Sequence, residues 1–428
     1  MNTRSSTTVM WLIGPLLLFA STFPYIQFTP SSSYTQPQAY VLGILLFPFC
    51  LRSLFRLRKT DSISIISLTF IGLVLFVITC FPYNNPQEYK YFLVYLSPLL
   101  FIPVFLTTIQ TAPIQTIKVL QVSIALWLLV STVQVFIEPN FATSLLGPWS
   151  NSTANIISSG RGVLGLAPEP THNGFHTLLL GAALSLIDNS RLSRFLTFGC
   201  IGSAVFLAAS GSALLVLVLG TLFWMLRCKP LLGITAVVVG VILVKLSPLI
   251  LLEQLNTDSR IGILLRLFFE NPADFLTVDY SVNVRLGGFW ITLRESFLFG
   301  LFPHGLSQDA WLKTREGILE TNDWLLGLSL AGPPSGIGLL MFQCGFLAVP
   351  FLTIFIRRLY TNLPTTITGQ VITISVLFIF FSQFYLSSPM FSMIYAFILR
   401  KDYIQHIFSS SSFRIPTQHN NPTSLQVK

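Results

Sequence analysis

Charge is scarce in this sequence of 428 residues. Only 10% of the residues are Asp, Glu, Lys or Arg, 52% are hydrophobic, and the mean hydropathy is +0.71. Such a composition excludes an ordinary soluble enzyme, because apolar runs of this length must be covered by lipid. The sequence also lacks a P-loop, an HExxH motif and a dinucleotide-binding fingerprint, so no common nucleotide-binding or zinc-hydrolase site is indicated.

Cysteine is rare as well, and the five cysteines have no C-x-x-C spacing. A disulfide framework, a redox centre or a zinc site is therefore not indicated. His172 and His176 are four residues apart and share a helix face, but a pair of histidines without a third ligand favours packing over metal binding.

Long apolar segments predict an all-α, polytopic bundle of transmembrane helices, since about 20 apolar residues cross the hydrocarbon core. We count twelve candidate spans, within a range of eleven to thirteen, because the seventh and eighth are short and the last is weak. The short pair meets at Ser210-Gly211-Ser212 and predicts a tight helical hairpin. The spans are 8–26, 38–55, 62–82, 91–109, 114–137, 172–188, 195–210, 212–227, 231–252, 333–356, 366–386 and 389–403.

Basic residues follow alternate spans and predict the orientation. They cluster after spans two, six, eight, ten and twelve, whereas the intervening short loops carry only Lys90 and Arg161. Positive residues stay on the cytoplasmic side, so both termini are predicted in the cytoplasm. The net charge of +9 then reflects topology and contact with membrane lipid rather than a nucleic-acid partner.

The chain is predicted to form a single membrane domain over residues 1–404, including an uncleaved first span. A disordered cytosolic tail, rich in Ser, Asn, Pro and Thr, is predicted over residues 405–428. Two long segments face outward, residues 138–171 and residues 253–332. The second holds ten of the sixteen acidic residues, which makes the outer side the natural place for chemistry.

The first outer segment ends in a stiff stretch that carries two candidate residues. Arg161 lies between glycines, which let a backbone approach a ligand closely. Glu169 lies between prolines, and proline disfavours helix in the preceding residue, so this stretch is predicted to be extended. Thr171 is the predicted N-cap of the next span. A carboxylate at the end of a membrane helix is costly, which favours a functional role for Glu169 over a charge that only marks the boundary.

The second outer segment contains a predicted amphipathic helix, Val284–Phe299, resting on the membrane surface or on the bundle. Arg285 flanks its apolar stripe at the level of the lipid headgroups, and His304 lies in the following turn. Arg260 and Arg266 precede the helix. Because the planar guanidinium donates two parallel hydrogen bonds to phosphate, these arginines suggest a lipid-linked phosphate or pyrophosphate. The predicted apolar stripe consists of Leu286, Phe289, Trp290, Leu293 and Phe297.

Several short motifs, in this order, resemble the O-antigen polymerase and ligase superfamily over roughly residues 130–350. They are Arg-Gly-x-x-Gly-x-x-x-Glu-Pro at 161–170, a Ser-x-Ser hairpin, Arg-x4-Trp at 285–290, Pro-x-Gly at 303–305 and Thr-Asn-Asp-Trp-Leu-Leu before Gly332 and Gly336-x-Gly338. Two positions depart from the family. Gly211 stands where an arginine is frequent, and Thr321 stands where ligases have a histidine, which favours a polymerase.

The resemblance implies an integral-membrane glycosyltransferase that is similar to the C-type fold. Such proteins act on undecaprenyl-pyrophosphate-linked oligosaccharide at the outer face of the bacterial plasma membrane. They transfer a growing chain, with inversion, onto a sugar hydroxyl of the next lipid-linked unit. The resemblance implies no metal, nucleotide sugar or other cofactor, and it makes a chain-length regulator or a flippase a candidate partner.

On this interpretation Arg161 and Arg285 contact the pyrophosphate, with Arg260 or Arg266 as a third contact. Glu169 is the candidate for activating the acceptor hydroxyl, and His304 is the second candidate. A ligase using the same donor, a lipid-linked glycan transporter or flippase, and a structural or sensory protein remain alternatives. An enzyme is favoured over a transporter, because transporters usually hold ionisable groups near the bilayer midplane.

Overall fold

The computed structural model describes residues 3–27, 37–79, 89–146, 162–246, 277, 283–330, 332–382 and 386–410. Within these residues the regular elements are helices, apart from one isolated bridge between Ile26 and Leu146. The predicted all-α class is therefore confirmed for the described residues.

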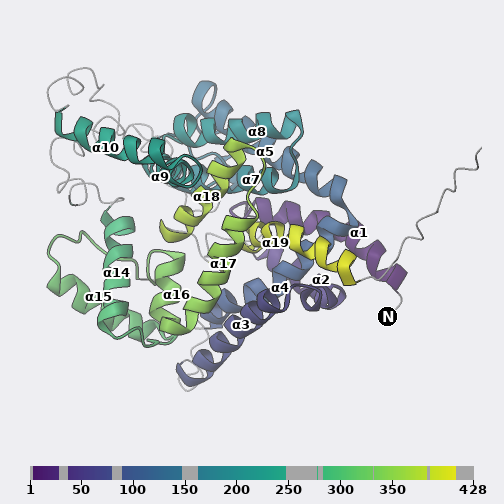
Figure 1. Cartoon of the computed structure of the whole chain (residues 1–428), viewed down its shortest axis with the longest axis horizontal. Helices are drawn as coiled ribbons and strands as arrows, with labels where there is room; N and C mark the ends of the chain where they lie inside the picture. The colour runs from purple at the N-terminus through teal and green to yellow at the C-terminus, as the bar shows by residue number, and fades with distance from the viewer. Residues whose placement is uncertain are drawn as a thin grey trace, which may run out of the picture.

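The helices, seen in Figure 1, are α1 (Thr3–Thr22), α2 (Gln38–Phe55), α3 (Lys59–Thr79), α4 (Tyr89–Thr111), α5 (Pro113–Phe136), α7 (Pro170–Ile187), α8 (Arg191–Gly202), α9 (Gly211–Cys228), α10 (Pro230–Leu246), α14 (Gly288–Leu298), α15 (Gln308–Thr321), α16 (Gly336–Cys344), α17 (Val349–Thr361), α18 (Ile367–Ser382) and α19 (Pro389–Ser410). Short helical turns are η3 (Thr143–Leu145), η4 (Ser203–Leu207), η6 (Asn283–Gly287) and η7 (Gly345–Ala348).

Six described segments are long and apolar enough to cross a membrane. They are Gln38–Phe55, Lys59–Thr79, Tyr91–Thr111, Pro113–Phe136, Gly211–Cys228 and Gly336–Thr361. Shorter apolar helices lie at Thr8–Thr22, Pro230–Val239, Ile367–Ser382 and Pro389–Arg400. The chain is thus a helical membrane protein.

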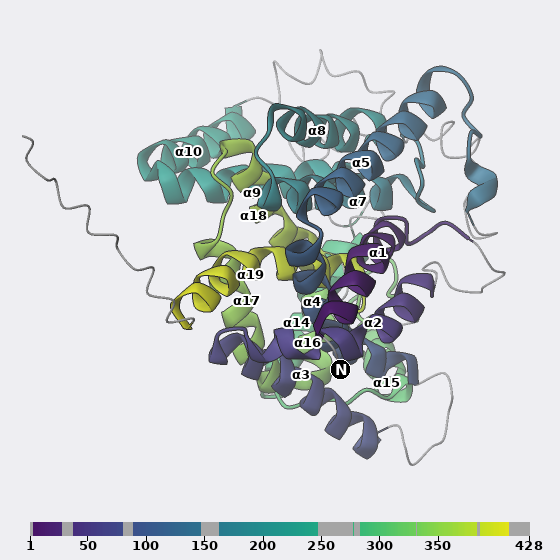
Figure 2. The ribbon, with the colours of Figure 1, turned by 90° about the vertical axis from the view of Figure 1, so that its right-hand side faces the viewer.

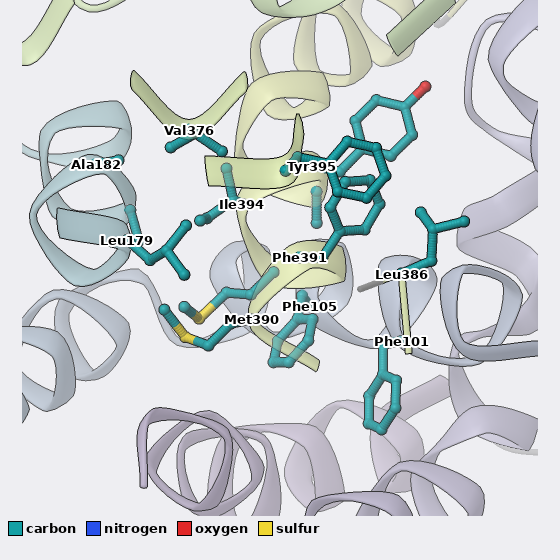
Figure 3. Packing of buried hydrophobic residues seen from close by; sticks show 14 of the residues in the cluster. Phe101, Phe105, Leu179, Ala182, Val376, Leu386, Met390, Phe391, Ile394 and Tyr395 are labelled. Carbon is teal, nitrogen blue, oxygen red and sulfur yellow. The ribbon is translucent and has the colours of Figure 1, made fainter. Parts of the chain in front are cut away.

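Helix α19 lies at the centre of the bundle, although its sequence is only a weak span (Figures 1 and 2). It packs against α4, α7 and α17, and its residues 390–399 are almost fully buried. Figure 3 shows Phe391 and Ile394 of this helix among Phe105 of α4 and Leu179 of α7. A helix enclosed by other helices is held by side-chain packing, so it needs less apolar length than one that faces lipid.

Contacts between loop segments fall into two groups at opposite helix ends. The first group contains the Ile26–Leu146 bridge between the segments after α1 and α5, and the bond from Val163 N to Leu207 O (2.9 Å) between the segments before α7 and α9. It also contains the bond from Leu306 N, just before α15, to Thr79 Oγ1 at the C-terminal end of α3 (3.0 Å). In the second group, Arg358 Nε at the C-terminal end of α17 bonds to Asp61 Oδ1 at the N-terminal end of α3 (2.8 Å). Asn189 Nδ2, just after α7, bonds to Thr365 Oγ1, just before α18 (3.0 Å). Arg400 Nη1 of α19 bonds to Ile187 O at the C-terminal end of α7 (3.3 Å).

The predicted amphipathic helix forms as η6 and α14, but the buried face is not the expected one. Ile291, Thr292 and Ser296 are buried, whereas Trp290 and Phe297 are 61% and 58% exposed. Helix α14 packs against α16, and the hydroxyls of Thr292 and Ser296 bond to carbonyls one turn back in their own helix. Small residues let membrane helices approach closely, while aromatic residues can face lipid.

The predicted disordered tail begins too early. Helix α19 continues to Ser410, because apolar residues keep a helical spacing through Tyr403, Ile404, Ile407 and Phe408 and no glycine or proline interrupts them. Residues 411–428 lie outside the described part of the chain.

A buried ion pair joins α3 to α17. Arg358 Nε donates to Asp61 Oδ1 at 2.8 Å, with side chains 10% and 1% exposed. Removing one partner leaves the other charge buried, so we expect Arg358→Met to lower the free energy of unfolding by roughly 3–5 kcal/mol. Thermal unfolding in detergent measures this loss. Arg357→Met, at the exposed neighbouring position, is the matched control, and equal unfolding midpoints would contradict the prediction.

Candidate functional site

Glu169 and Arg285 form an ion pair, although 116 residues separate them. Arg285 Nη2 lies 3.1 Å from Glu169 Oε2, and Nη1 donates to Thr171 Oγ1 at 3.2 Å. The side chains of Arg285 and Glu169 are 13% and 33% exposed. The structure therefore brings together two of the predicted site residues at a partly open position.

The segment before α7 holds Glu169 in place. Gln134 of α5 bonds to both sides of Gly165, accepting from its N–H at 2.7 Å and donating to its carbonyl at 3.0 Å. Asn173 donates to the carbonyl of Val163 at 3.2 Å. Glu169 itself is the N-cap, with extended backbone (φ −145°, ψ 151°), and Pro170 is the first helical residue. The predicted extended backbone is confirmed at Glu169, although residues 165–168 form turns and bends, and Thr171 lies inside the helix and is not its cap.

Gly162 fixes the same segment against the junction between α8 and α9. Its missing Cβ would lie 2.3 Å from Leu207 O and from the carbonyl carbon of Ala208. The atoms that approach Gly162 closely are thus backbone atoms of Leu207 and Ala208. The junction is not a packed hairpin: α8 packs mainly on α7 and α5, whereas α9 packs mainly on α18 and α10. Ser210 caps α9 by accepting from Ala213 N at 3.2 Å.

Asn283 positions Arg285 from the other side. Its amide donates to Trp324 O at 2.9 Å, and its carbonyl oxygen accepts from Leu326 N at 2.8 Å. Gly287 lies under the Trp324 ring, where a Cβ would come within 2.8 Å of the ring edge. These contacts hold η6, and therefore Arg285, against the segment that follows α15.

Tyr25, His172 and His176 border the ion pair and were not among the predicted site residues. The Tyr25 hydroxyl lies 3.4 Å from His172 Nδ1. His176 is fully buried and bonds through Nε2 to Thr22 O at 2.8 Å. The signal that could have found His172 was its position in the first turn of α7, three residues after the candidate Glu169.

His304 lies beyond the opposite end of α14, a helix about 16 Å long. Its Nδ1 is 3.2 Å from Phe342 O, and its ring lies between those of Phe299 and Phe342, each 4.2 Å away between centroids. Burial lowers the pKa of His304, and the bond to Phe342 O acts in the opposite direction. The structure therefore does not bring His304 to the ion pair. Arg161, Arg260 and Arg266 lie outside the described residues.

No protein-family model matches the chain, and no curated protein matches it in sequence. Among the described residues, no group of three or more His, Cys, Asp or Glu side chains is arranged to hold a metal ion. The site therefore has to be interpreted from its own groups. A guanidinium, a hydroxyl and a carboxylate in one contact can bind an anion, provided that the anion takes the place of the carboxylate on the arginine.

Rigidity of the segment before α7 is testable at Gly162. We expect Gly162→Ala to lower the thermal unfolding midpoint, because its Cβ meets backbone atoms that cannot rotate away. Gly202→Ala is the matched control, since a Cβ there has no neighbour within 4 Å. In a helix that change should be neutral or stabilising by about 0.5–1 kcal/mol. Equal effects of the two substitutions would contradict the described packing.

Proposed function

We propose that this protein is an integral-membrane glycosyltransferase that polymerises a polysaccharide at the outer face of the bacterial plasma membrane. A glycan linked to undecaprenyl pyrophosphate is transferred, with inversion, onto a sugar hydroxyl of another lipid-linked unit. The observation that supports this most is the ion pair of Glu169 with Arg285. The resemblance assigned these residues to acceptor and pyrophosphate separately, and they lie in contact.

The grouping of loop contacts supports a chain that crosses the membrane twelve times. If the helices alternate in direction, each loop contact given above joins ends on one and the same side. The end that holds Asp61 and Arg358 also carries Arg56, Arg191 and Arg227, so the positive-inside rule makes it cytoplasmic. Glu169 and Arg285 then belong to the outer face, where a lipid-linked sugar awaits transfer.

The exposed aromatic residues of α14 fit a lipid-linked donor. Trp290, Phe297 and Leu298 are each more than half exposed on the helix that begins three residues after Arg285. Such a face suits the membrane boundary, where aromatic side chains anchor between lipid and water. A pyrophosphate at headgroup depth would therefore reach Arg285 while its polyprenyl chain stays in the bilayer.

The chemistry uses an exchange of partners on Arg285. An incoming pyrophosphate replaces the Glu169 carboxylate on the guanidinium, with Thr171 as a second polar contact. As the bond from C1 to the phosphate oxygen breaks, Arg285 stabilises the charge that develops on the leaving group. Glu169, released from the arginine, is then available to activate the attacking hydroxyl.

Arg285→Ala is expected to abolish chain growth, because loss of a donor at a developing charge lowers kcat by roughly 10²–10³. Glu169→Gln is expected to abolish it as well, because the carboxylate that activates the attacking hydroxyl is lost. The measurement is the profile of carrier-linked glycans in a strain lacking the gene and complemented with each variant. Single repeat units should accumulate with both variants and not with wild type. Arg294→Ala and Glu138→Gln, at exposed positions of the same outer segments, are the matched controls and should restore polymer.

Other profiles would contradict the proposal. Accumulation of long carrier-linked chains would identify a ligase, which uses the same donor and a different acceptor. If deletion of the gene left the profile of carrier-linked glycans unchanged, the glycosyltransferase would be rejected and a transporter would be the favoured alternative.

A further inference from the structure

Two side chains beside the ion pair have no role in the reaction as described above. Tyr25 follows α1, and His172 is in the first turn of α7. The tyrosine hydroxyl lies 3.4 Å from His172 Nδ1, and the two rings meet edge to face with centroids 5.7 Å apart. Tyr25 is only 7% exposed. An imidazole next to a candidate acceptor site is therefore held by a buried phenol.

The surroundings of Tyr25 restrict its movement. Its ring also meets the edge of the His176 ring, with centroids 5.9 Å apart. His176 in turn is fixed by its bond to Thr22 O at 2.8 Å and by the Trp127 ring at 4.5 Å. His176 therefore serves packing, and the contacts leave His172 as the imidazole that borders the ion pair.

His172 lies in the first turn of α7, three residues after Glu169, which is the extended N-cap of that helix. Both Tyr25 and His172 lie within range of the Glu169 charge, and His172 is also within range of Arg285. The titratable and charged groups facing His172 are thus Glu169, Arg285, Tyr25 and His176.

In the proposed exchange of partners the Glu169 carboxylate leaves Arg285, to which it is bonded in the unliganded structure, and becomes free to act on a neighbouring group. An imidazole that is held by a hydrogen bond at one ring nitrogen can accept a proton at the other, which is the arrangement of a general base. A carboxylate next to an imidazole favours the imidazolium that forms when the ring accepts a proton.

We propose that His172 accepts the proton of the attacking sugar hydroxyl, with Tyr25 as its positioning residue and Glu169 acting through it. The inference rests on the proposed function and specifies how Glu169 activates the acceptor. When Nδ1–H donates to the Tyr25 oxygen, the lone pair is on Nε2, which receives the proton. The hydroxyl O–H bond breaks and its oxygen bonds to C1. The bond from C1 to phosphate breaks, its electron pair leaves with the pyrophosphate beside Arg285, and the imidazolium later releases its proton to water.

The test uses the full chain in lipid nanodiscs, with the carrier-linked single units that accumulate in the deletion strain as substrate. We expect His172→Gln to lower kcat by about 10²-fold or more, as expected for loss of a general base. The rise of the rate with pH on the acid side should disappear in this variant. Its dissociation constant for inorganic pyrophosphate should stay unchanged, because Arg285 and Thr171 remain in place.

Tyr25→Phe provides the second variant if His172→Gln does not fold. It should lower kcat by less than the roughly 10²-fold expected for loss of the base itself, since the imidazole stays and loses only its orienting hydroxyl. Tyr40→Phe is the matched control, because it removes another buried hydroxyl that donates to a carbonyl, that of Ser387. The inference would be overturned if His172→Gln had the kcat and the pH profile of wild type. If His172→Gln does not fold, the same result in Tyr25→Phe would overturn it.

Failure of the proposed function would look different. Arg285→Ala would then bind inorganic pyrophosphate as tightly as wild type, or wild type would not lengthen the carrier-linked units. Either result contradicts the pyrophosphate site itself, whereas the His172 variants test only which group takes the proton.

Discussion

A contact between a glutamate and an arginine, from two segments far apart in the chain, holds the candidate site together. A charge next to lipid is costly unless a partner or water offsets it, and here each charge is the partner of the other. The pair therefore fixes α7 relative to η6 and α14 when no ligand is bound. An anion that replaces the glutamate would neutralise the Arg285 guanidinium in the same way. The guanidinium therefore has a negatively charged partner both in the unliganded structure and in the proposed complex.

Amides inside apolar helices make this contact rigid. Gln134, Asn173 and Asn283 are buried, and each bonds to backbone of a neighbouring segment. Side-chain amides satisfy loop backbone that would otherwise be unpaired in an environment without water. The described residues around Glu169 and Arg285 are thus tied to neighbouring helices and loops, which is the condition for placing a carboxylate and a guanidinium at hydrogen-bonding distance.

Hydropathy predicted where the helices lie, because lipid requires long apolar segments and the same residues fold into helices. Local chemistry predicted the extended backbone of Glu169 and selected Glu169 and Arg285 as candidate site residues. The sequence did not predict that these two would meet, since that depends on helix packing. Nor did it predict the buried face of α14: in lipid an apolar residue can face outward, so the apolar stripe does not mark the core. Helix α15 was missed because its many charges hide the few buried residues, Trp311 and Ile318.

The bound state offers the most direct test of the central claim. A cryo-electron-microscopy structure of the protein in nanodiscs with undecaprenyl pyrophosphate would locate the pyrophosphate and the two charged side chains. The account predicts phosphate oxygens on the Arg285 guanidinium and beside Thr171, with the Glu169 carboxylate moved off the arginine toward His172. A pyrophosphate bound elsewhere, with the ion pair still closed, would contradict it.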